Sequence, residues 1–298
     1  MRELETLAYF TPVFVWIIFM SLWPILITFD PYAVNTTFLP LCDYYLTMGR
    51  YYFVNHIFTY NNPWIIFLAA IPYTLHFLMP FIFGIVISLE TYFKTEGCKT
   101  ALRWRVCAFF WTFGMVNVLG ITIQWLFPTA PPWWYDIPLP EETTAHVVTE
   151  MSGNPAVFAI LDQHFNNTFF THLYSKSTIV YGSYPSLHAA WPVITCYFTL
   201  NKRQFWKRTV WSVYLLWIWW AAVYTKHHFV MDVLGGICLG VIAIILHRVV
   251  LTKSICNLKK LGGTVEGIDD IPPTPYIYFH NCHEKVSFNP HTLQSKDL

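Results

Sequence analysis

Charged side chains are scarce in this chain of 298 residues. Asp, Glu, Lys and Arg make up 12% of it, about half the share usual in soluble proteins, whereas 55% of the residues are hydrophobic and 19% aromatic. The formal net charge is only +1, so no basic surface argues for a nucleic-acid partner. The composition therefore excludes an ordinary soluble domain and favours an integral membrane protein in contact with the lipid bilayer.

Closely spaced cysteines are also lacking. The seven Cys residues are scattered, without a CxxC pair or a cluster of Cys and His at the spacing of metal ligands. Most of them lie in or beside apolar runs, where Cys packs as a small hydrophobic residue. The sequence therefore predicts neither a disulfide framework nor a metal site, and it implies no other cofactor.

Apolar runs recur along the chain at lengths that fit a bilayer. A membrane-spanning helix needs about 20 apolar residues. Pro72 and Pro80 lie inside the second run, which we expect to kink or split but count as one span. The prediction is an all-α polytopic membrane protein with about six transmembrane helices in a bundle. The runs occupy residues 8–29, 64–89, 104–127, 186–201, 209–225 and 230–251.

The distribution of Lys and Arg predicts the orientation of these spans. With the N-terminus on the cytosolic side, the cytosolic segments 90–105, 201–208 and 248–298, together with Arg2, hold fifteen of the eighteen basic residues. The opposite face then carries a connection at 30–63, with a short interfacial helix, and the long loop 128–185. Two glycosylation sequons, at Asn35 and Asn166, fall on that same face. The basic residues outside the cytosolic segments are Arg50, Lys176 and Lys226.

Two short stretches carry residues suited to chemistry. Gly182-Ser183-Tyr184-Pro185-Ser186-Leu187-His188 opens the fourth span, and His227-His228-Phe229-Val230-Met231-Asp232-Val233-Leu234-Gly235-Gly236 lies between the fifth and the sixth. The topology derived from charge alone puts both on the non-cytosolic face. Ionisable groups at a membrane boundary are costly unless they are paired or hydrated, so they suggest a functional site.

The spacing within these stretches predicts roles for three residues. If residues 228–232 begin a helix, His228 and Asp232 lie one turn apart and share a face. Asp232 then accepts from one ring nitrogen of His228 and leaves the other nitrogen as a nucleophile towards phosphorus. At the start of the fourth span, Ser186 and free backbone amides can hold phosphate oxygens, and a protonated His188 can serve as acid and base. The remaining histidines are read as interfacial or satisfied residues; these include His56, His76, His146, His164, His172 and His247.

The same stretches resemble the type 2 phosphatidic acid phosphatase superfamily, and within it the fungal inositol phosphorylceramide synthases. The likeness rests on Gln124-Trp125-Leu126-Phe127-Pro128-Thr129-Ala130-Pro131-Pro132-Trp133-Trp134, on the motif ending in His188, and on Tyr224-Thr225-Lys226-His227-His228. It covers roughly residues 60–250. It implies a six-helix membrane core, His228 as nucleophile, Asp232 as the carboxylate that orients it, and His188 as acid and base at the leaving group.

The resemblance also implies a reaction. A phosphohistidine at His228 would hold phosphoinositol taken from phosphatidylinositol, and a ceramide hydroxyl would resolve it with diacylglycerol released. Water replaces ceramide in the phosphatases. The family relationship further implies lipid substrates, a Golgi or endoplasmic reticulum location with the site facing the lumen, and a small membrane subunit as a candidate partner. The corresponding domains are an N-terminal span with an external loop (1–63), a catalytic membrane core (64–251) and a mostly disordered cytosolic tail (252–298).

The sequence departs from the family where arginines are expected. No Arg-Pro pair exists, Ala221-Ala222 stands where the phosphatases carry Ser-Arg, and Ile160 stands near the place of a synthase arginine. The non-cytosolic cations nearest the motifs are Lys226 and Lys176, and further donors for substrate come from His227, Ser186 and Trp133. Because few cations are available on this face, the sequence favours a donor lipid with a singly charged phosphodiester. A lipid phosphate phosphatase and a catalytically inactive lipid-binding scaffold subunit stay open as alternatives.

Overall fold

The computed structural model describes residues 2–28, 34–50, 52, 54–94, 99–136, 153–177, 180–199 and 205–260. They form α-helices and short 3₁₀ turns, with isolated backbone bridges from Thr129 to Asn35 and Gly182. The predicted all-α class is confirmed. The elements are α1 (Arg2–Thr28), α2 (Phe38–Leu46), η1 (Val54–Ile57), α3 (Pro63–Leu75), α4 (Met79–Lys94), α5 (Lys99–Leu126), η2 (Pro132–Asp136), η3 (Ala156–Phe158), α7 (Ala159–His164), α8 (Phe169–Ser175), α9 (Leu187–Thr199), α10 (Phe205–Tyr224) and α11 (Val230–Lys260).

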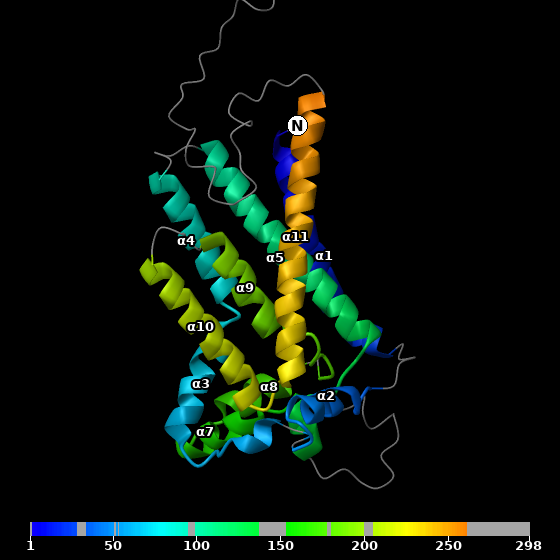
Figure 1. The fold of residues 1–298 in the computed structure, drawn as a ribbon, viewed down its shortest axis with the longest axis vertical. Coiled ribbons are helices and arrows are strands. Elements are labelled where there is room, and N and C mark those ends of the chain that lie inside the picture. Colours follow the sequence, from blue (N-terminus) through cyan, green and yellow to red (C-terminus); the bar gives the residue numbers. More distant parts are fainter. Residues whose placement is uncertain are drawn as a thin grey trace, which may run out of the picture.

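The long helices pack side by side, and the short helices gather at one end of the molecule (Figure 1). α1 runs along α5, α11 packs on both α9 and α5, and α10 packs on α3 and α9. The short helices α2, α7 and α8 lie at the end where α11 begins. This end, referred to below as the site end, brings together the loops that the sequence placed on one face.

Several helices are apolar enough to cross a membrane. Within the described residues, Val106–Leu126 of α5 and Val230–Val250 of α11 qualify by length and hydropathy, and α3 with Met79–Leu89 of α4 would make a third if the bent pair is one span. Shorter apolar stretches lie at Phe10–Trp23 in α1 and Thr209–Tyr224 in α10. Two to three candidate spans are therefore established.

The second apolar run is broken, and its prolines explain where. α3 and α4 meet at an angle of 64°, across residues 76–78. In a continuous helix the amide of residue 80 would donate to the carbonyl of His76, but Pro80 has no N–H. Pro80 instead suits the first turn of a new helix, where that amide has no partner in any case. The run begins with Asn62, whose Oδ1 accepts from the amide of Trp64 at 2.9 Å, followed by Pro63.

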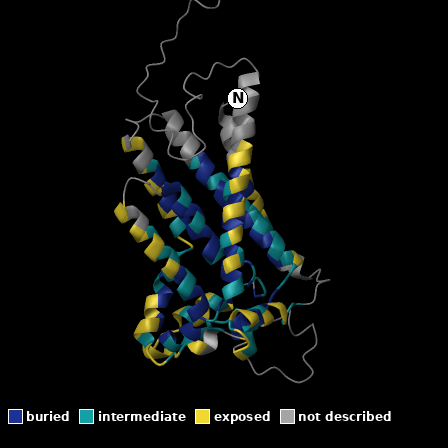
Figure 2. Cartoon of the chain, in the orientation of Figure 1, coloured by how far each residue is buried: buried dark blue, intermediate teal, exposed yellow. Residues whose placement is uncertain are grey.

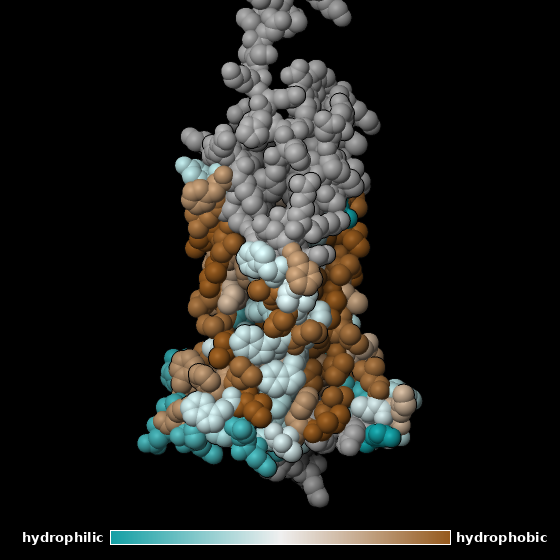
Figure 3. All heavy atoms as spheres, turned by 60° about the vertical axis from the view of Figure 1, so that its left-hand side comes forward, coloured by the Kyte–Doolittle hydropathy of each residue, from teal (hydrophilic) through white to brown (hydrophobic). Residues whose placement is uncertain are grey.

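The interior of the bundle is aromatic and aliphatic, and its lateral surface is apolar too. Buried residues face the neighbouring helices while exposed ones face outwards (Figure 2). Large apolar side chains such as Phe81 and Leu216 are more than half exposed on this lateral surface. In Figure 3 the sides of the molecule are hydrophobic and hydrophilic residues collect at the site end. An apolar belt of this extent fits a lipid environment.

The last helix extends into the segment that the sequence assigned to the tail. α11 continues to Lys260, so residues 252–260 are helical rather than irregular. The helix carries on because no Pro or Gly interrupts it before the glycines at 262 and 263. The rest of the predicted tail, residues 261–298, lies outside the described residues, as does the stretch 137–152 of the long loop.

Candidate active site

The two stretches singled out in the sequence meet in the structure. Nε2 of His228, in the loop between α10 and α11, lies 3.2 Å from Nδ1 of His188, in the first turn of α9. His228 is 6% exposed. The two imidazoles therefore stand at one end of the bundle, within reach of a single phosphoryl group.

The hydrogen bonds of His228 assign its tautomer. Its Nδ1 lies 3.1 Å from the carbonyl oxygen of Ser183, which can only accept a hydrogen bond. Nδ1 therefore carries the proton and Nε2 carries the lone pair. Asp232 Oδ2 lies 3.4 Å from the same Nδ1, at ion-pair distance. The predicted pairing of His228 with Asp232 is present, but a backbone carbonyl is the nearer acceptor.

The carboxylate of Asp232 is itself held by two donors. Its Oδ2 accepts from the amide of Phe229 at 2.8 Å and from the hydroxyl of Ser183 through a short hydrogen bond. The Phe229 bond satisfies an amide at the start of α11, where the helix leaves its first amides without internal partners. Ser183 thus fixes His228 through its carbonyl and Asp232 through its hydroxyl. The sequence motif contained Ser183, but nothing in the local pattern indicated this double role.

Glycines in α11 let it approach the start of α9. The amide of Ser186 donates to the carbonyl of Asp232 at 3.0 Å. A Cβ placed on Gly236 would lie 2.1 Å from the Ser186 carbonyl oxygen, and one on Gly235 would lie 2.3 Å from the ring of Tyr184. At this close crossing the Ser186 amide is already hydrogen-bonded to α11. The Ser186 amide is therefore not one of the free amides, because packing of α9 on α11 uses it, and phosphate binding by Ser186 stays a prediction.

The break between α3 and α4 adds two rings that the sequence reading did not assign to the site. Tyr73 stacks on His188, with ring centroids 4.0 Å apart and planes 8° apart. The His76 ring lies 3.7 Å from that of His188, centroid to centroid, and its Nδ1 donates to the Tyr73 carbonyl at 2.5 Å. His76 was expected to be an ordinary interfacial residue. The two prolines around it were the signal that the helix turns away here and exposes this segment to the site.

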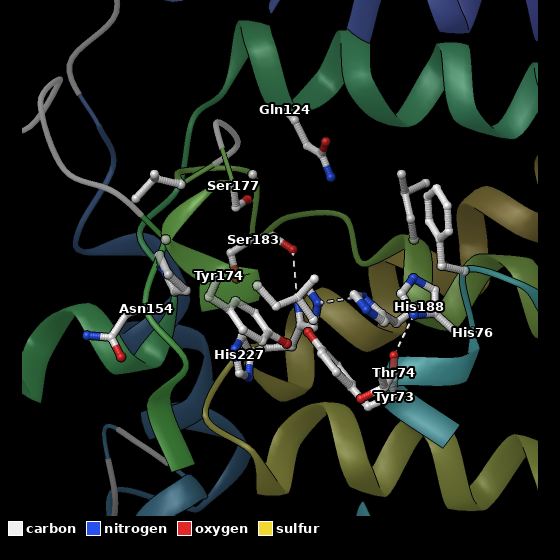
Figure 4. Close-up of a pocket in the computed structure, with 18 of the residues that line it drawn as sticks. Tyr73, Thr74, His76, Gln124, Asn154, Tyr174, Ser177, Ser183, His188 and His227 are labelled. Atoms are coloured by element: carbon white, nitrogen blue, oxygen red, sulfur yellow. Dashed lines mark hydrogen bonds between the residues drawn. The ribbon is translucent and has the colours of Figure 1, made fainter. Parts of the chain in front are cut away.

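A cavity of about 560 Å³ joins these groups (Figure 4). Four histidines line it: His76, His188, His227 and His228. Trp16 and Met20 of α1 also line it. No Lys, Arg, Asp or Glu of the described chain lines it. Nor does that part of the chain contain a group of three or more His, Cys, Asp or Glu side chains placed to hold a metal ion.

The other predicted substrate residues divide between the cavity and the surface. His227 and Trp133 line the cavity and are buried. Lys226 does not line it, because its Nζ pairs with Asp136 at 2.7 Å and lies 5.3 Å from the Tyr60 ring. Lys176 is exposed outside it. The structure thus gives neither lysine a place at the cavity wall. Asp136 is 90 residues from Lys226, so no local pattern showed this pairing.

The predicted glycosylation sites occupy different environments. Asn166 is exposed in the turn between α7 and α8. Asn35 is half-buried, and its Oδ1 accepts from the amides of Thr37 and Phe38 just before α2. Asn166 lies between the short helices α7 and α8, and Asn35 lies just before α2. Asn166 therefore offers the more accessible side chain.

A second buried carboxyl lies beside the site. Asp43 of α2 is fully buried and its Oδ2 accepts from the amide of Val54 at 2.9 Å. Burial raises the pKa of Asp43 to about 6; the charge of Asp232 also raises it, and hydrogen bonds from the amides of Val54 and Val230 act against them. α2 packs on α11. Asp43 therefore links the external segment to the helix that carries Asp232.

A buried histidine and a pair of short helices complete the site end. Burial lowers the pKa of His227 to about 3, and the neighbouring His228 acts in the same direction.

Asp162 of α7 accepts from the amides of Phe170 and Thr171, at 3.0 and 2.7 Å, and so fixes α8 against α7. Burial raises the pKa of Asp162, but hydrogen bonds from Thr171 and Phe170 outweigh it and hold the pKa below its usual value.

The chain is thus all-α, has candidate membrane spans and brings two histidines together beside an aspartate. The family model of the PAP2 superfamily matches residues 42–246, which is more than half of the chain. The chain belongs to the PAP2 superfamily, as the resemblance of its motifs predicted.

Several curated proteins are similar to the chain. The catalytic subunit aur1 of inositol phosphorylceramide synthase from Schizosaccharomyces pombe is 32% identical over 221 residues, covering 74% of this chain and 47% of that protein. Inositol phosphorylceramide synthase from Candida albicans is 33% identical over 174 residues, covering 58% and 34%. Phosphoinositol dihydroceramide synthase from Bacteroides thetaiotaomicron is 34% identical over 170 residues, covering 57% and 51%.

These relatives are longer than the chain. It spans between 34% and 51% of the length of the three. No solved structure matches the chain significantly.

Proposed function

We propose that this chain is a lipid phosphotransferase that moves a phosphoinositol-type head group from a glycerophospholipid to ceramide. The observation that carries the proposal is the 3.2 Å contact between Nε2 of His228 and Nδ1 of His188 at the wall of the cavity. The assigned tautomer leaves Nε2 with its lone pair, as a nucleophile requires. The similarity to proteins named inositol phosphorylceramide synthase supports the choice of head group and acceptor.

In the first half of the proposed reaction, Nε2 of His228 forms a bond to phosphorus. The bond between phosphorus and the diacylglycerol oxygen breaks, and protonated His188 gives its proton to that oxygen. Asp232 stabilises the positive charge that develops on the His228 ring. In the second half, the ceramide oxygen bonds to phosphorus, the phosphorus–nitrogen bond breaks, and the hydroxyl proton passes to His188. The products are diacylglycerol and phosphoinositol ceramide.

The charge of the cavity supports a diester donor over a monoester. A phosphate monoester brings up to two negative charges at neutral pH, and a diester brings one. No described Lys or Arg lines the cavity. A diester with a single negative charge needs less positive charge from the site than a doubly charged monoester does. Of the predicted phosphate ligands, we carry Ser186, His227 and Trp133 forward and leave out both lysines.

The membrane arrangement is part of the proposal. We infer six spans, formed by α1, the bent α3–α4 pair, α5, α9, α10 and α11, with the N-terminus cytosolic and the site end in the lumen of the Golgi or endoplasmic reticulum. The excess of Lys and Arg at the other end supports this orientation. Residues 64–251 then make up the catalytic core. A small membrane subunit remains a proposed partner.

The test is head-group transfer by the purified chain in detergent. Phosphatidylinositol with ceramide is offered in one reaction and phosphatidic acid in another, and the lipid products are separated. We expect inositol-containing ceramide and diacylglycerol from the first reaction and little phosphate from the second. Rapid phosphate release from phosphatidic acid, without head-group transfer, would establish a phosphatase instead. Specific lipid binding with no turnover of either donor would establish the scaffold alternative.

A further inference from the structure

A third histidine lies beside the two that the proposed reaction uses, and that reaction gives it no role. His76 stands in the break between α3 and α4, and its ring centroid lies 3.7 Å from that of His188. Both side chains line the cavity (Figure 4). His188 is the residue that would take the proton of the acceptor hydroxyl. His76 is therefore placed to contact the lipid that reacts at His188.

One ring nitrogen of His76 is used by the protein and the other is not. Nδ1 lies 2.5 Å from the carbonyl oxygen of Tyr73, which can only accept a hydrogen bond, so Nδ1 carries the proton and Nε2 carries the lone pair. In the described part of the chain Nε2 has no hydrogen-bond partner, yet it is not a buried atom. Because His76 lines the cavity, a ligand bound there can donate a hydrogen bond to this nitrogen.

The donors of the neighbouring rings are engaged elsewhere. Trp191 packs 5.1 Å from the His76 ring, centroid to centroid, but its Nε1 donates to Oδ1 of Asn117 at 3.0 Å. Nδ1 of His188 lies 3.2 Å from Nε2 of His228. The rings of Trp191 and His188 therefore restrict the His76 imidazole without supplying a donor for it. An acceptor held in this way is preorganised for a ligand.

The two lipid alcohols of the proposed reaction differ in their hydrogen-bond donors. Apart from its reacting hydroxyl, diacylglycerol has only ester oxygens, which accept. Ceramide carries an amide N–H and a second hydroxyl on the two carbons that follow its reacting end, and both of these groups donate. An acceptor beside His188 can therefore form a hydrogen bond with ceramide that diacylglycerol cannot form.

The part of the cavity next to His76 is apolar. Phe77 and Leu78, which follow it in the break, line the cavity and are more than half exposed. The helices on either side, α3 and α4, are the bent pair that would form one membrane span. An apolar wall within a candidate span suits the hydrocarbon chains of a lipid. A lipid with its chains against Phe77 and Leu78 would have its polar end beside His76.

We propose that His76 selects the acceptor lipid: its Nε2 accepts a hydrogen bond from the amide N–H or the second hydroxyl of ceramide while the first hydroxyl meets His188. The inference rests on the proposed phosphotransfer, because it concerns the lipid that resolves the phosphohistidine. His76 forms and breaks no covalent bond, and the hydroxyl proton still passes to His188. The hydrogen bond favours ceramide over the diacylglycerol just formed, which would otherwise attack the phosphohistidine and restore the donor lipid.

The test compares two acceptors, each offered alone to the full chain in detergent with phosphatidylinositol as donor. Ceramide yields phosphoinositol ceramide. Labelled diacylglycerol attacks the same phosphohistidine and yields labelled phosphatidylinositol, which is the reverse of the first half-reaction. The proposal gives Nε2 of His76 a hydrogen bond in the first case and none in the second.

Two variants separate the two nitrogens of His76. The amide in His76→Asn can donate to the Tyr73 carbonyl but does not reach the position of Nε2, whereas the longer amide in His76→Gln can place its oxygen there. We expect the ratio of kcat/KM for ceramide to kcat/KM for diacylglycerol to fall by about 10- to 100-fold in His76→Asn, as for loss of one hydrogen bond. In His76→Gln the ratio should stay within about threefold of wild type. Loss of the imidazole packing on His188 acts on both acceptors and cancels in the ratio.

An unchanged ratio in His76→Asn would overturn the proposal. An equal fall in both variants would overturn it too, because the preference would then follow the ring and not the acceptor atom.

A binding measurement separates this proposal from the proposed transfer. Short-chain ceramide should raise the Tm of the wild-type chain more than short-chain diacylglycerol does, and the difference should vanish in His76→Asn. That pattern without turnover would reject the transfer reaction and keep the selection of ceramide by His76. Equal Tm shifts from both lipids in the wild-type chain would reject the selection even if ceramide is a substrate.

Discussion

Two regions of the molecule bury polar side chains and use them in opposite ways. At the α5–α9 contact in the bundle, Asn117 donates to the Phe113 carbonyl at 2.7 Å and accepts from Nε1 of Trp191 at 3.0 Å. At the site end, Nε2 of His227 and Oδ1 of Asp232 are buried without a hydrogen-bond partner in the described chain. Each unmade bond costs about 1–3 kcal/mol. The polar groups at the α5–α9 contact stabilise the structure itself, whereas those at the site end are left without a partner.

The largest effect should come from the nucleophile at the site end. Asparagine in His228→Asn retains a donor for the Ser183 carbonyl but has no nucleophilic nitrogen, so head-group transfer should fall by at least about 10⁴-fold. The Tm should stay within about 3 °C of wild type. Product formation is followed with labelled phosphatidylinositol. Wild-type turnover by a folded variant would remove His228 from the mechanism.

A smaller loss should follow from disturbing the carboxylate behind His228. Asp232→Asn removes the charge that stabilises the developing imidazolium and should lower kcat by about 10²- to 10⁴-fold. Ser183→Ala removes one hydrogen bond to that carboxylate and should lower kcat by about 10-fold. KM for the donor lipid should change little in either variant. A change confined to KM would instead make the pair substrate ligands.

The aromatic clamp on His188 should have a modest effect. An aromatic pair contributes about 0.5–1.5 kcal/mol beyond area burial, so Tyr73→Leu should lower kcat by about 3- to 10-fold. Tyr73→Phe keeps the stacked ring and serves as the matched control at close to wild-type rate. Kinetics of the two variants in the same detergent provide the measurement. Equal losses in both would assign the effect to the hydroxyl and not to the stack.

In the bundle the comparison predicts loss of stability without loss of chemistry. Asn117→Ala leaves Nε1 of Trp191 and the Phe113 carbonyl without their side-chain partner, so it should reduce stability by about 1–2 kcal/mol. Its kcat should stay within about twofold of wild type, because Asn117 does not line the cavity. Thermal denaturation and transfer assays of one preparation test both parts. A fall in kcat at unchanged Tm would contradict the division between the two regions.

The smallest effect concerns the pH dependence of stability. The folded-state pKa of Asp43, about 6, lies above its ordinary value of 3.8, so the folded chain holds this proton more tightly than the unfolded chain. The contribution of Asp43 to stability is therefore fully present at low pH and is lost as pH rises from about 4 to about 6. Asp43→Asn should remove that slope and raise the Tm at pH 7. A Tm profile from pH 4 to pH 8 with the same slope in both proteins would contradict this assignment.

The sequence predicted the helical framework well because apolar length is a local property. The predicted apolar runs at 8–29, 104–127 and 209–225 coincide closely with α1, α5 and α10. The predicted pairing of His228 with Asp232 is present, but only Asp232 lies in the first turn of α11, and His228 lies in the loop just before it. Charge scarcity and the motifs together indicated the superfamily that the family comparison shows.

What the sequence missed depends on contacts between distant segments. The Ser183 hydroxyl reaches Asp232 across 49 residues, and Lys226 reaches Asp136 across 90. The angle at the α3–α4 break, which carries His76 to His188, depends on packing against other helices and not on the prolines alone. Burial of Asp43 likewise requires α2 to dock on α11. None of these distances is encoded in a local period or a short motif.

The most direct test is covalent trapping at His228. The chain is mixed with phosphatidylinositol labelled in the inositol ring, without ceramide, and quenched under alkaline conditions that preserve a phosphorus–nitrogen bond. The account predicts label on the peptide that contains His228, removal of that label when ceramide is added, and no label in His228→Asn. Steady transfer of inositol phosphate to ceramide with no labelled histidine at any quench time would contradict it.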